Sequence, residues 1–270
     1  MSLRSRHTVR LGMMRITSGK WTLDENMDKF LHVLEEASRK GVELAVTPES
    51  YLDGYAVAAP DSSREKLLAD AAQDLENSPY LSRVAEEAGR RGMWIVFGFT
   101  ENKDGKLYNS AGLWNAQGEL VGVYHKVHLQ VQDLQFDQSD GIPVFDSPWG
   151  PLGMMICADR RWPETSRVLR LQGAQLILNP TAGMNHELNT CLMRARSWEN
   201  NCYIAFNHPL TSLLTDPEGN IVVKVDENED LVVADIDLRT ADLACNNDTG
   251  NVTVRRPDLY GAVTDTSIRT

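Results

Sequence analysis

The chain has 270 residues, of which 42% are hydrophobic and 24% are charged, and these proportions are ordinary for a globular protein. The net charge of −11 argues against anionic partners such as nucleic acids or acidic membrane surfaces. Because no stretch approaches the roughly 18 apolar residues of a membrane span, and residues 1–15 lack a signal-peptide core, we expect a cytoplasmic protein with no membrane partner.

Strand-like and helix-like segments alternate along the first half of the chain. The first helix is expected to begin after Thr22, with a capping box to Glu25, and to end before Gly41. Further helices are expected at 62–75 and at 79–90, the second beginning with Ser78-Pro79. Strands are expected at 9–16, 42–49, 93–101, 107–115 and 119–126.

The second half continues the alternation. Helices are expected at 163–172 and 186–199, and strands at 143–148, 150–157, 175–181, 202–207, 213–225 (a hairpin) and 230–238. We expect residues 1–8 to be flexible and residues 240–270 to be extended. Helices mixed with several hairpins indicate mixed sheets covered by helices, in an α/β class or a layered α+β sandwich.

The four cysteines are widely spaced and form no CxxC pair. A chain of this length buries enough surface to be stable without disulfides. The pattern therefore favours free thiols in a reducing compartment.

Three of the expected strands finish in reactive side chains. The strand before Glu49 ends at Pro48, which cannot donate to a sheet ladder, and two others end in Lys126 and Cys157. If these ends lie side by side, a carboxylate, an ammonium and a thiol meet at the rim where α/β sheets commonly place their sites.

The chemistry of such a trio is coherent. A free thiol has a pKa near 8.5, so a nearby ammonium has to stabilise the thiolate while a carboxylate takes the proton. Glu49 would be the general base and Cys157 the nucleophile, and Lys126 would stabilise the oxyanion of acyl transfer through a thioester. Taken singly, each residue also fits a plain structural role: a core cysteine, a solvated lysine and a loop glutamate.

Longer segments around these residues resemble the nitrilase, or carbon–nitrogen hydrolase, superfamily over nearly the whole chain. They are "TPESYLDGY" (47–55), "YHKVHL" (124–129), "GMMICADRRWPE" (153–164), "RARSWENNCYIAFN" (194–207) and "RRPDLYG" (255–261). The resemblance implies a four-layer α-β-β-α sandwich with two mixed sheets, formed as one domain by residues 1–270. It also implies a Glu49-Lys126-Cys157 triad that needs no metal and no other cofactor.

The residues after the cysteine are similar to those of amidase-like branches. True nitrilases carry Trp-Glu at this point, whereas this chain has Ala158-Asp159. The segment 156–174 is especially similar to N-carbamoyl-D-amino-acid amidohydrolases, in which an arginine holds the substrate carboxylate. By that match Arg160 or Arg161 would bind an anionic group; the alternative is a salt bridge to an acidic neighbour such as Glu164.

Further substrate contacts follow from the same resemblance. His128 matches a histidine near the carbamoylase site, although a structural histidine is an equal alternative, and Asn179 matches the pocket wall or a plain turn. Asp133 is the candidate for the family's second glutamate. Val131 stands where the carbamoylases carry another histidine. The histidines at 125 and 128 lack the ligand spacing of a zinc site.

The leading hypothesis is a thiol hydrolase that cleaves a C–N bond of a small amide or N-carbamoyl compound and releases ammonia. The alternatives are an ω-amidase or aliphatic amidase acting on a neutral amide, and a non-catalytic scaffold with the same fold. Members of the family associate through the helix after the cysteine and the C-terminal segment, so we expect a homodimer or a higher homo-oligomer.

Overall fold

The computed structural model describes residues 7–58, 68–227, 229–247 and 251–267. Two six-stranded sheets form its centre, with strand orders β12-β1-β2-β3-β4-β5 and β11-β10-β9-β8-β7-β6. The first contains β1 (Thr8–Met14), β2 (Leu44–Val46), β3 (Trp94–Lys103), β4 (Lys106–Trp114), β5 (Leu120–His125) and β12 (Leu231–Asp237). The second contains β6 (Val144–Phe145), β7 (Leu152–Met154), β8 (Leu176–Pro180), β9 (Tyr203–His208), β10 (Thr211–Thr215) and β11 (Ile221–Val225).

Both sheets are mixed. Their central strands run parallel (β1, β2 and β3 in one sheet, β7, β8 and β9 in the other), and the flanking strands pair antiparallel. The parallel strands read as nearly continuous apolar runs because both of their faces are covered.

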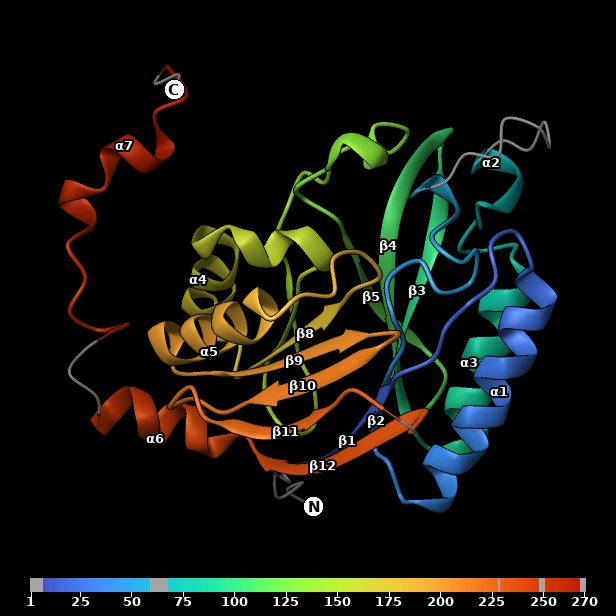
Figure 1. Cartoon of the computed structure of the whole chain (residues 1–270), viewed down its shortest axis with the longest axis horizontal. Helices are drawn as coiled ribbons and strands as arrows, with labels where there is room; N and C mark the ends of the chain where they lie inside the picture. Colours follow the sequence, from blue (N-terminus) through green and yellow to red (C-terminus); the bar gives the residue numbers. More distant parts are fainter. Residues whose placement is uncertain (1–6, 59–67, 228, 248–250, 268–270) are drawn as a thin grey trace.

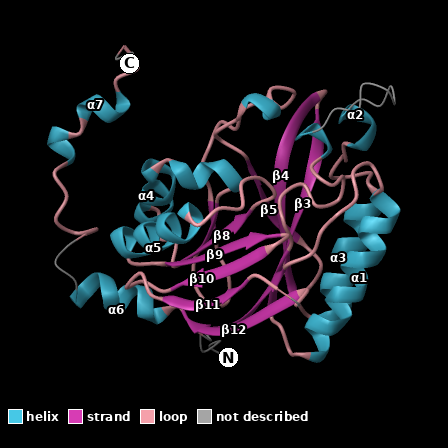
Figure 2. Ribbon diagram, in the orientation of Figure 1, coloured by secondary structure: helices cyan, strands magenta, loops and turns pink. Residues whose placement is uncertain are grey.

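Helices cover the outer face of each sheet, as Figures 1 and 2 show. The first sheet is covered by α1 (Leu23–Arg39) and α3 (Pro79–Arg91), and the second by α4 (Pro163–Leu171) and α5 (Leu188–Asn200). The shorter helices are α2 (Leu68–Ala71), α6 (Arg239–Asn247) and α7 (Gly261–Thr264), with 3₁₀ turns η1 (Ala56–Ala58), η2 (Val131–Asp133), η3 (Cys157–Arg161) and η4 (Pro257–Leu259). The predicted four-layer α-β-β-α sandwich is therefore confirmed.

Three apolar layers hold the sandwich together. The middle layer, which includes Leu11, Val46 and Leu178, lies between the two sheets, and the outer two lie between each sheet and its helices. Full burial of one such side chain stabilises the fold by about 1.5–3 kcal/mol. The buried Asn207 side chain of β9 crosses the middle layer and donates to the carbonyls of Met14 and Val46, 3.0 Å away in each case. This polar link joins the two sheets near the ends of β1 and β2.

The predicted capping box at Thr22 is wrong, although α1 does begin directly after it. The Thr22 side chain makes no cap hydrogen bond because it is turned toward Gly19. Asn26 binds that loop instead: its Oδ1 accepts the Gly19 N–H and its Nδ2 donates to the Gly19 carbonyl, both at 2.7 Å.

The chain ends also depart from expectation. Residues 240–247 belong to helix α6, so the extended prediction for 240–270 is wrong there, and Thr8 already lies in β1. The helix predicted at 62–75 is wrong at 72–75, since α2 ends at Ala71 and Gln73 forms a β-bridge with Glu101. Residues 1–6, 62–67, 248–250 and 268–270, on which parts of these predictions fall, lie outside the described residues. Within the described ranges, every helix is too short or too polar to cross a membrane.

Candidate active site

The loop after β2 carries Glu49 into the interior of the molecule, where only 1% of the residue is exposed. This loop crosses β3 so closely that a Cβ at Gly98 would lie 2.4 Å from the Pro48 carbonyl oxygen, and only glycine leaves room for it. The Glu49 carboxylate accepts three hydrogen bonds. Oε1 binds Lys126 Nζ at 2.8 Å and Asn109 Nδ2 at 2.9 Å, and Oε2 binds the Ala182 N–H at 2.9 Å.

Lys126 directly follows β5, and its side chain has no exposed surface. Its ammonium lies between two carboxylates, 2.8 Å from Glu49 Oε1 and 2.7 Å from Asp133 Oδ2. Burial alone would lower the pKa of Lys126, but the negative charges around it, Glu49 first, raise that pKa above its usual value. The lysine is therefore a fixed positive charge.

Asp133 is a second buried carboxylate that binds Lys126. It lies in the loop after β5, seven residues beyond the lysine. Its Oδ1 accepts the Tyr55 hydroxyl at 2.6 Å and its Oδ2 accepts the Gln130 N–H at 2.9 Å. The Tyr55 ring also faces the ammonium of Lys126, 5.5 Å from the ring centroid. Asp133 is thus held from both sides.

Cys157 does not end a strand, and this correction changes its geometry. Strand β7 stops at Met154, and Cys157 is the first residue of the 3₁₀ turn η3. Its φ of +45° lies in the left-handed region, which costs a residue other than glycine about 1–3 kcal/mol. Cys157 therefore lies on a sharp turn and not in the sheet.

The Cys157 thiol lies in a field of opposing charges. Burial, with the Glu49 carboxylate second, raises the pKa of Cys157, while Lys126 and Arg160 act to lower it. The raised pKa means that the resting group is a thiol, and that a base has to remove its proton during reaction.

The two candidate arginines point in different directions. Arg160 is 2% exposed, and its Nη1 lies 3.5 Å from the Cys157 sulfur. Its Nε and Nη2 donate to Asn189 Oδ1 at 3.0 and 2.8 Å, and Nη2 also reaches the Met184 carbonyl. Arg161 is exposed and donates to Gln130 Oε1 at 2.6 Å. The structure brings Arg160, and not Arg161, to the thiol.

His128 and Asn179 both bind other groups of the protein. His128 Nδ1 lies 2.8 Å from Asp159 Oδ1, and its ring stacks on Trp162 with 4.0 Å between centroids. Asn179 is fully buried and donates from Nδ2 to the Met155 carbonyl at 2.8 Å, which ties the end of β8 to the segment before Cys157.

Sequence reasoning missed several contributors to the site: Tyr55, Asn109, Ala182 and Asn189. Asn109 could have been found from its amide, because a buried amide in a strand requires a hydrogen-bond partner. Ala182 acts through its backbone N–H, which no side-chain pattern reveals.

A cavity of about 480 Å³ opens beside Glu49 and is also lined by Lys20, Tyr55, Ala182 and Gly183. A Cβ at Gly183 would lie 3.2 Å from the Cys157 sulfur, so this wall of the cavity lies against the thiol. Lys20, another lining residue, is exposed and lies on the loop between β1 and α1. The cavity is large enough for a small organic substrate next to the carboxylate.

Comparisons with known proteins identify the family of the chain. The family described as "Carbon-nitrogen hydrolase" matches residues 9–244. A nitrilase of Pyrococcus abyssi is 30% identical over 250 residues, which cover 88% of this chain and 93% of that protein. An omega-amidase of Xenopus laevis is 29% identical over 243 residues, covering 80% and 84% of the two chains. The fold matches a nitrilase-superfamily amidase of Nesterenkonia with a TM-score of 0.81, at 23% identity and over 96% and 98% of the two chains.

Proposed function

Because the chain belongs to the carbon–nitrogen hydrolase family, and is an enzyme acting on carbon–nitrogen bonds other than peptide bonds, we propose that Cys157 is its nucleophile. The reaction is hydrolysis of a small amide through a thioester. The observation that carries the proposal is the buried 2.8 Å ion pair of Glu49 and Lys126, which acts electrostatically on the Cys157 sulfur. A base, a cation and a thiol in one buried site are the parts that acyl transfer requires.

The steps follow from this arrangement. The Cys157 proton passes to Glu49 as Sγ attacks the amide carbon, and Lys126 stabilises the oxyanion that forms. Glu49 then returns the proton to the amide nitrogen, the C–N bond breaks and ammonia leaves. Glu49 next takes a proton from water, which attacks the thioester, and the same proton restores the thiol as the carboxylic acid product departs.

Asp133 and Tyr55 hold Lys126 in place for these steps. The lysine has one carboxylate on each side, so loss of Asp133 would leave its ammonium free to move toward Glu49 alone. In this proposal Asp133 fulfils the positioning role of the family's second glutamate, with Tyr55 fixing the Asp133 carboxylate through a 2.6 Å hydrogen bond.

For the substrate, we favour a small amide that carries a carboxylate at its far end, as in the monoamide of a dicarboxylic acid. The exposed Lys20 lines the cavity and supplies a positive charge to it. The similarity to omega-amidases supports an amide as the substrate. An N-carbamoyl amino acid ranks second, because the Arg160 guanidinium that would bind its carboxylate already donates to Asn189 and Met184.

An ammonia-release assay with matched substrates tests the proposal. The set contains monoamides of dicarboxylic acids, neutral amides of the same length and N-carbamoyl amino acids. We expect turnover of the first group, and its loss in Cys157→Ala. Activity of that variant within tenfold of the unaltered enzyme would contradict a cysteine nucleophile. Preference for the N-carbamoyl acids would overturn the substrate choice alone.

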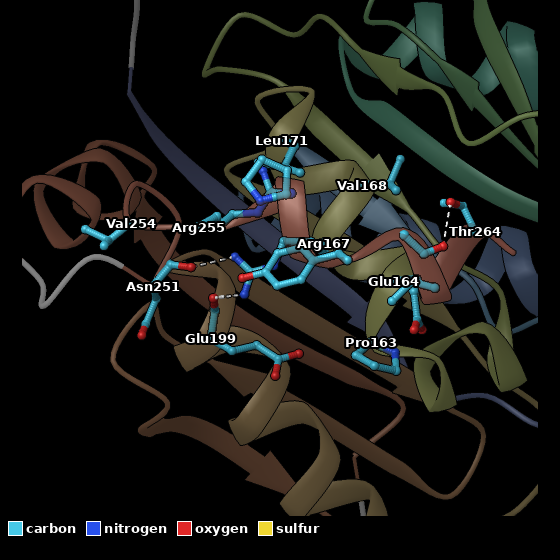
Figure 3. A pocket seen from close by; sticks show the side chains of 14 residues that line it. Pro163, Glu164, Arg167, Val168, Leu171, Glu199, Asn251, Val254, Arg255 and Thr264 are labelled. Carbon is cyan, nitrogen blue, oxygen red and sulfur yellow. Dashed lines mark hydrogen bonds between the residues drawn. The ribbon is translucent and has the colours of Figure 1, made fainter.

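We also propose that the enzyme works in the cytoplasm as a homodimer or higher homo-oligomer. All four cysteines are free thiols, which suits a reducing compartment. The C-terminal arm, residues 251–267, runs past α4 and exposes Val254, Leu259 and Val263 to between 60% and 76%. With Leu171 and other residues of α4 it lines a hollow of about 800 Å³, drawn in Figure 3.

A second copy of this chain is the expected occupant of that hollow, since the apolar residues of the arm lack cover from their own chain. Light scattering coupled to gel filtration should report at least a dimer, and Val263→Asp with Leu259→Asp should yield monomers. A monomeric unaltered enzyme at micromolar concentration would overturn the proposal.

A further inference from the structure

Asp159 lies two residues after Cys157, has no exposed surface, and its carboxylate receives hydrogen bonds from two separate parts of the chain. One oxygen, Oδ2, accepts the Ile156 N–H at 2.9 Å, the Tyr124 hydroxyl at 2.8 Å and, more weakly, the Val127 N–H at 3.5 Å. The other, Oδ1, accepts the His128 backbone N–H and its ring Nδ1, both at 2.8 Å. Carboxylate oxygens accept hydrogen bonds, so each of these groups acts as a donor here.

The bonds between Asp159 and Ile156 close the turn that contains Cys157. The Asp159 side chain binds the Ile156 N–H, and the Asp159 N–H binds the Ile156 carbonyl at 3.0 Å. Cys157 lies between these two residues with its φ at +45°. A left-handed cysteine persists only where its surroundings over-determine it, and the paired bonds between Ile156 and Asp159 provide that restraint.

The bonds from Tyr124 and His128 to Asp159 fix the segment that contains Lys126. Tyr124 precedes the lysine by two residues and His128 follows it by two, so the Asp159 carboxylate is bound to both flanks of Lys126. His128 is held in turn by stacking on Trp162, which follows η3. One carboxylate thus links the lysine segment to the cysteine turn.

We propose that Asp159 is a positioning residue that sets the location of the Cys157 sulfur relative to the Lys126 ammonium. The inference rests on the proposed function, in which these two groups act together on the substrate. Asp159 touches neither the substrate nor the reacting atoms, and it works by holding the backbone on both sides of each group. A displacement of about 1 Å between such groups is enough to lower a rate by about 100-fold.

The chemistry of the contacts explains why a carboxylate is needed. In Asp159→Asn one of the two oxygens becomes an NH₂ group, which can only donate. If that group takes the place of Oδ2, it faces the Ile156 N–H, and if it takes the place of Oδ1, it faces the His128 N–H. Either orientation takes the acceptor away from one backbone N–H, that of the buried Ile156 or that of the half-buried His128, and opens one side of the link.

The test compares Asp159→Asn with Glu87→Gln. Glu87 is also a buried carboxylate with several donors, but it lies on α3 and binds Arg83, Arg90 and Arg91. We expect Asp159→Asn to lower kcat/KM by about 100-fold, and Glu87→Gln to leave it unchanged even if both variants lose similar thermal stability.

Alkylation of Cys157 by iodoacetamide gives a second readout, measured in a Cys191→Ser background because Cys191 is exposed. If Asp159 positions Lys126 against the sulfur, its loss should move the pH profile of alkylation to higher pH, and a purely structural role would not. Asp159→Asn turnover within tenfold of the unaltered enzyme, with Cys157→Ala inactive, would overturn the inference alone. An active Cys157→Ala would instead overturn the proposed function.

Tyr124→Phe keeps the inference testable if Asp159→Asn fails to fold. It removes only the hydroxyl that binds Oδ2 and leaves the backbone contacts of Asp159 in place. We expect about a tenfold loss of kcat/KM and a smaller shift of the alkylation profile in the same direction. A Tyr124→Phe enzyme with unaltered rate and profile would contradict the role of Asp159.

Discussion

Glu49 and Lys126 are joined by a 2.8 Å hydrogen bond in a position where neither side chain has exposed surface. Burying such a pair costs several kcal/mol of desolvation per ion, which the mutual attraction offsets only when further hydrogen bonds satisfy both groups. Here Asn109 and the Ala182 N–H bind the carboxylate, and Asp133 binds the ammonium. The buried ion pair is therefore weak evidence for a contribution to folding stability, and stronger evidence for a functional site.

Glu49→Gln tests the assigned base. Glutamine keeps the shape of the side chain but cannot take the Cys157 proton, so we expect kcat to fall by about 10³-fold, within the range that general base catalysis contributes. The measurement is steady-state ammonia release, and Glu164→Gln on the exposed start of α4 is the control. A loss below tenfold would mean that another group accepts the proton.

Gly183→Ala tests whether substrate approaches the thiol along the cavity wall. The added methyl group would lie 3.2 Å from the Cys157 sulfur, closer than the usual 3.5–4.0 Å contact between heavy atoms. We expect kcat/KM to fall by at least tenfold, because either the sulfur or the wall must shift. Gly141→Ala, where an added Cβ meets no atom within 4 Å, should be neutral. Equal behaviour of the two variants would place the substrate elsewhere.

Lys20→Met tests the substrate class. An exposed ion pair is worth up to about 1 kcal/mol, so KM for a carboxylate-bearing amide should rise about fivefold in the variant. The dependence of this KM on salt concentration should become weaker. KM for the neutral amide of equal length should stay constant, as should both values in Lys103→Met, whose exposed side chain is at the far end of β3. An equal rise for both substrates would show that Lys20 does not bind the carboxylate.

The four-layer fold was predictable because its causes are local. The apolar periodicity of α1 and α3 and the unbroken apolar runs of β2 and β8 appear directly in the sequence. The turn at Cys157 was not predictable in the same way. "LGMMIC" continues as an apolar run, whereas the strand stops at Met154 and Asp159 folds back to bind Ile156.

Long-range contacts set the rest of the site. Arg160 and Arg161 are adjacent and identical, and the one that turns inward, Arg160, is held there by contacts with distant residues such as Asn189 on α5 and Phe206. The Ala182 N–H reaches Glu49 across 133 positions of sequence. Such contacts depend on how two sheets pack, which no local pattern encodes.

Asp53 gives the protein a pH-dependent stability of unusual sign. It is 1% exposed and accepts hydrogen bonds from the Ala56 N–H and the Thr100 hydroxyl, at 2.9 and 3.0 Å. Burial is the largest influence, and it raises the pKa of Asp53 to about 6. The unfolded chain has a pKa near 3.9 at this residue, so the folded state binds the proton more tightly. The stability from this group is complete below about pH 4 and is lost as the pH rises through about 6.

Asp53→Asn isolates this contribution because asparagine stays neutral at every pH. The difference of about two pKa units corresponds to about 3 kcal/mol, so the stability of the variant relative to the unaltered enzyme should increase by about that amount between pH 4 and pH 7. Urea unfolding at a series of pH values measures the difference. Asp237→Asn is a control of opposite sign, since a hydrogen bond from Arg239 lowers the pKa of Asp237. A relative stability of Asp53→Asn that stays constant with pH would show that the buried carboxyl keeps an ordinary pKa.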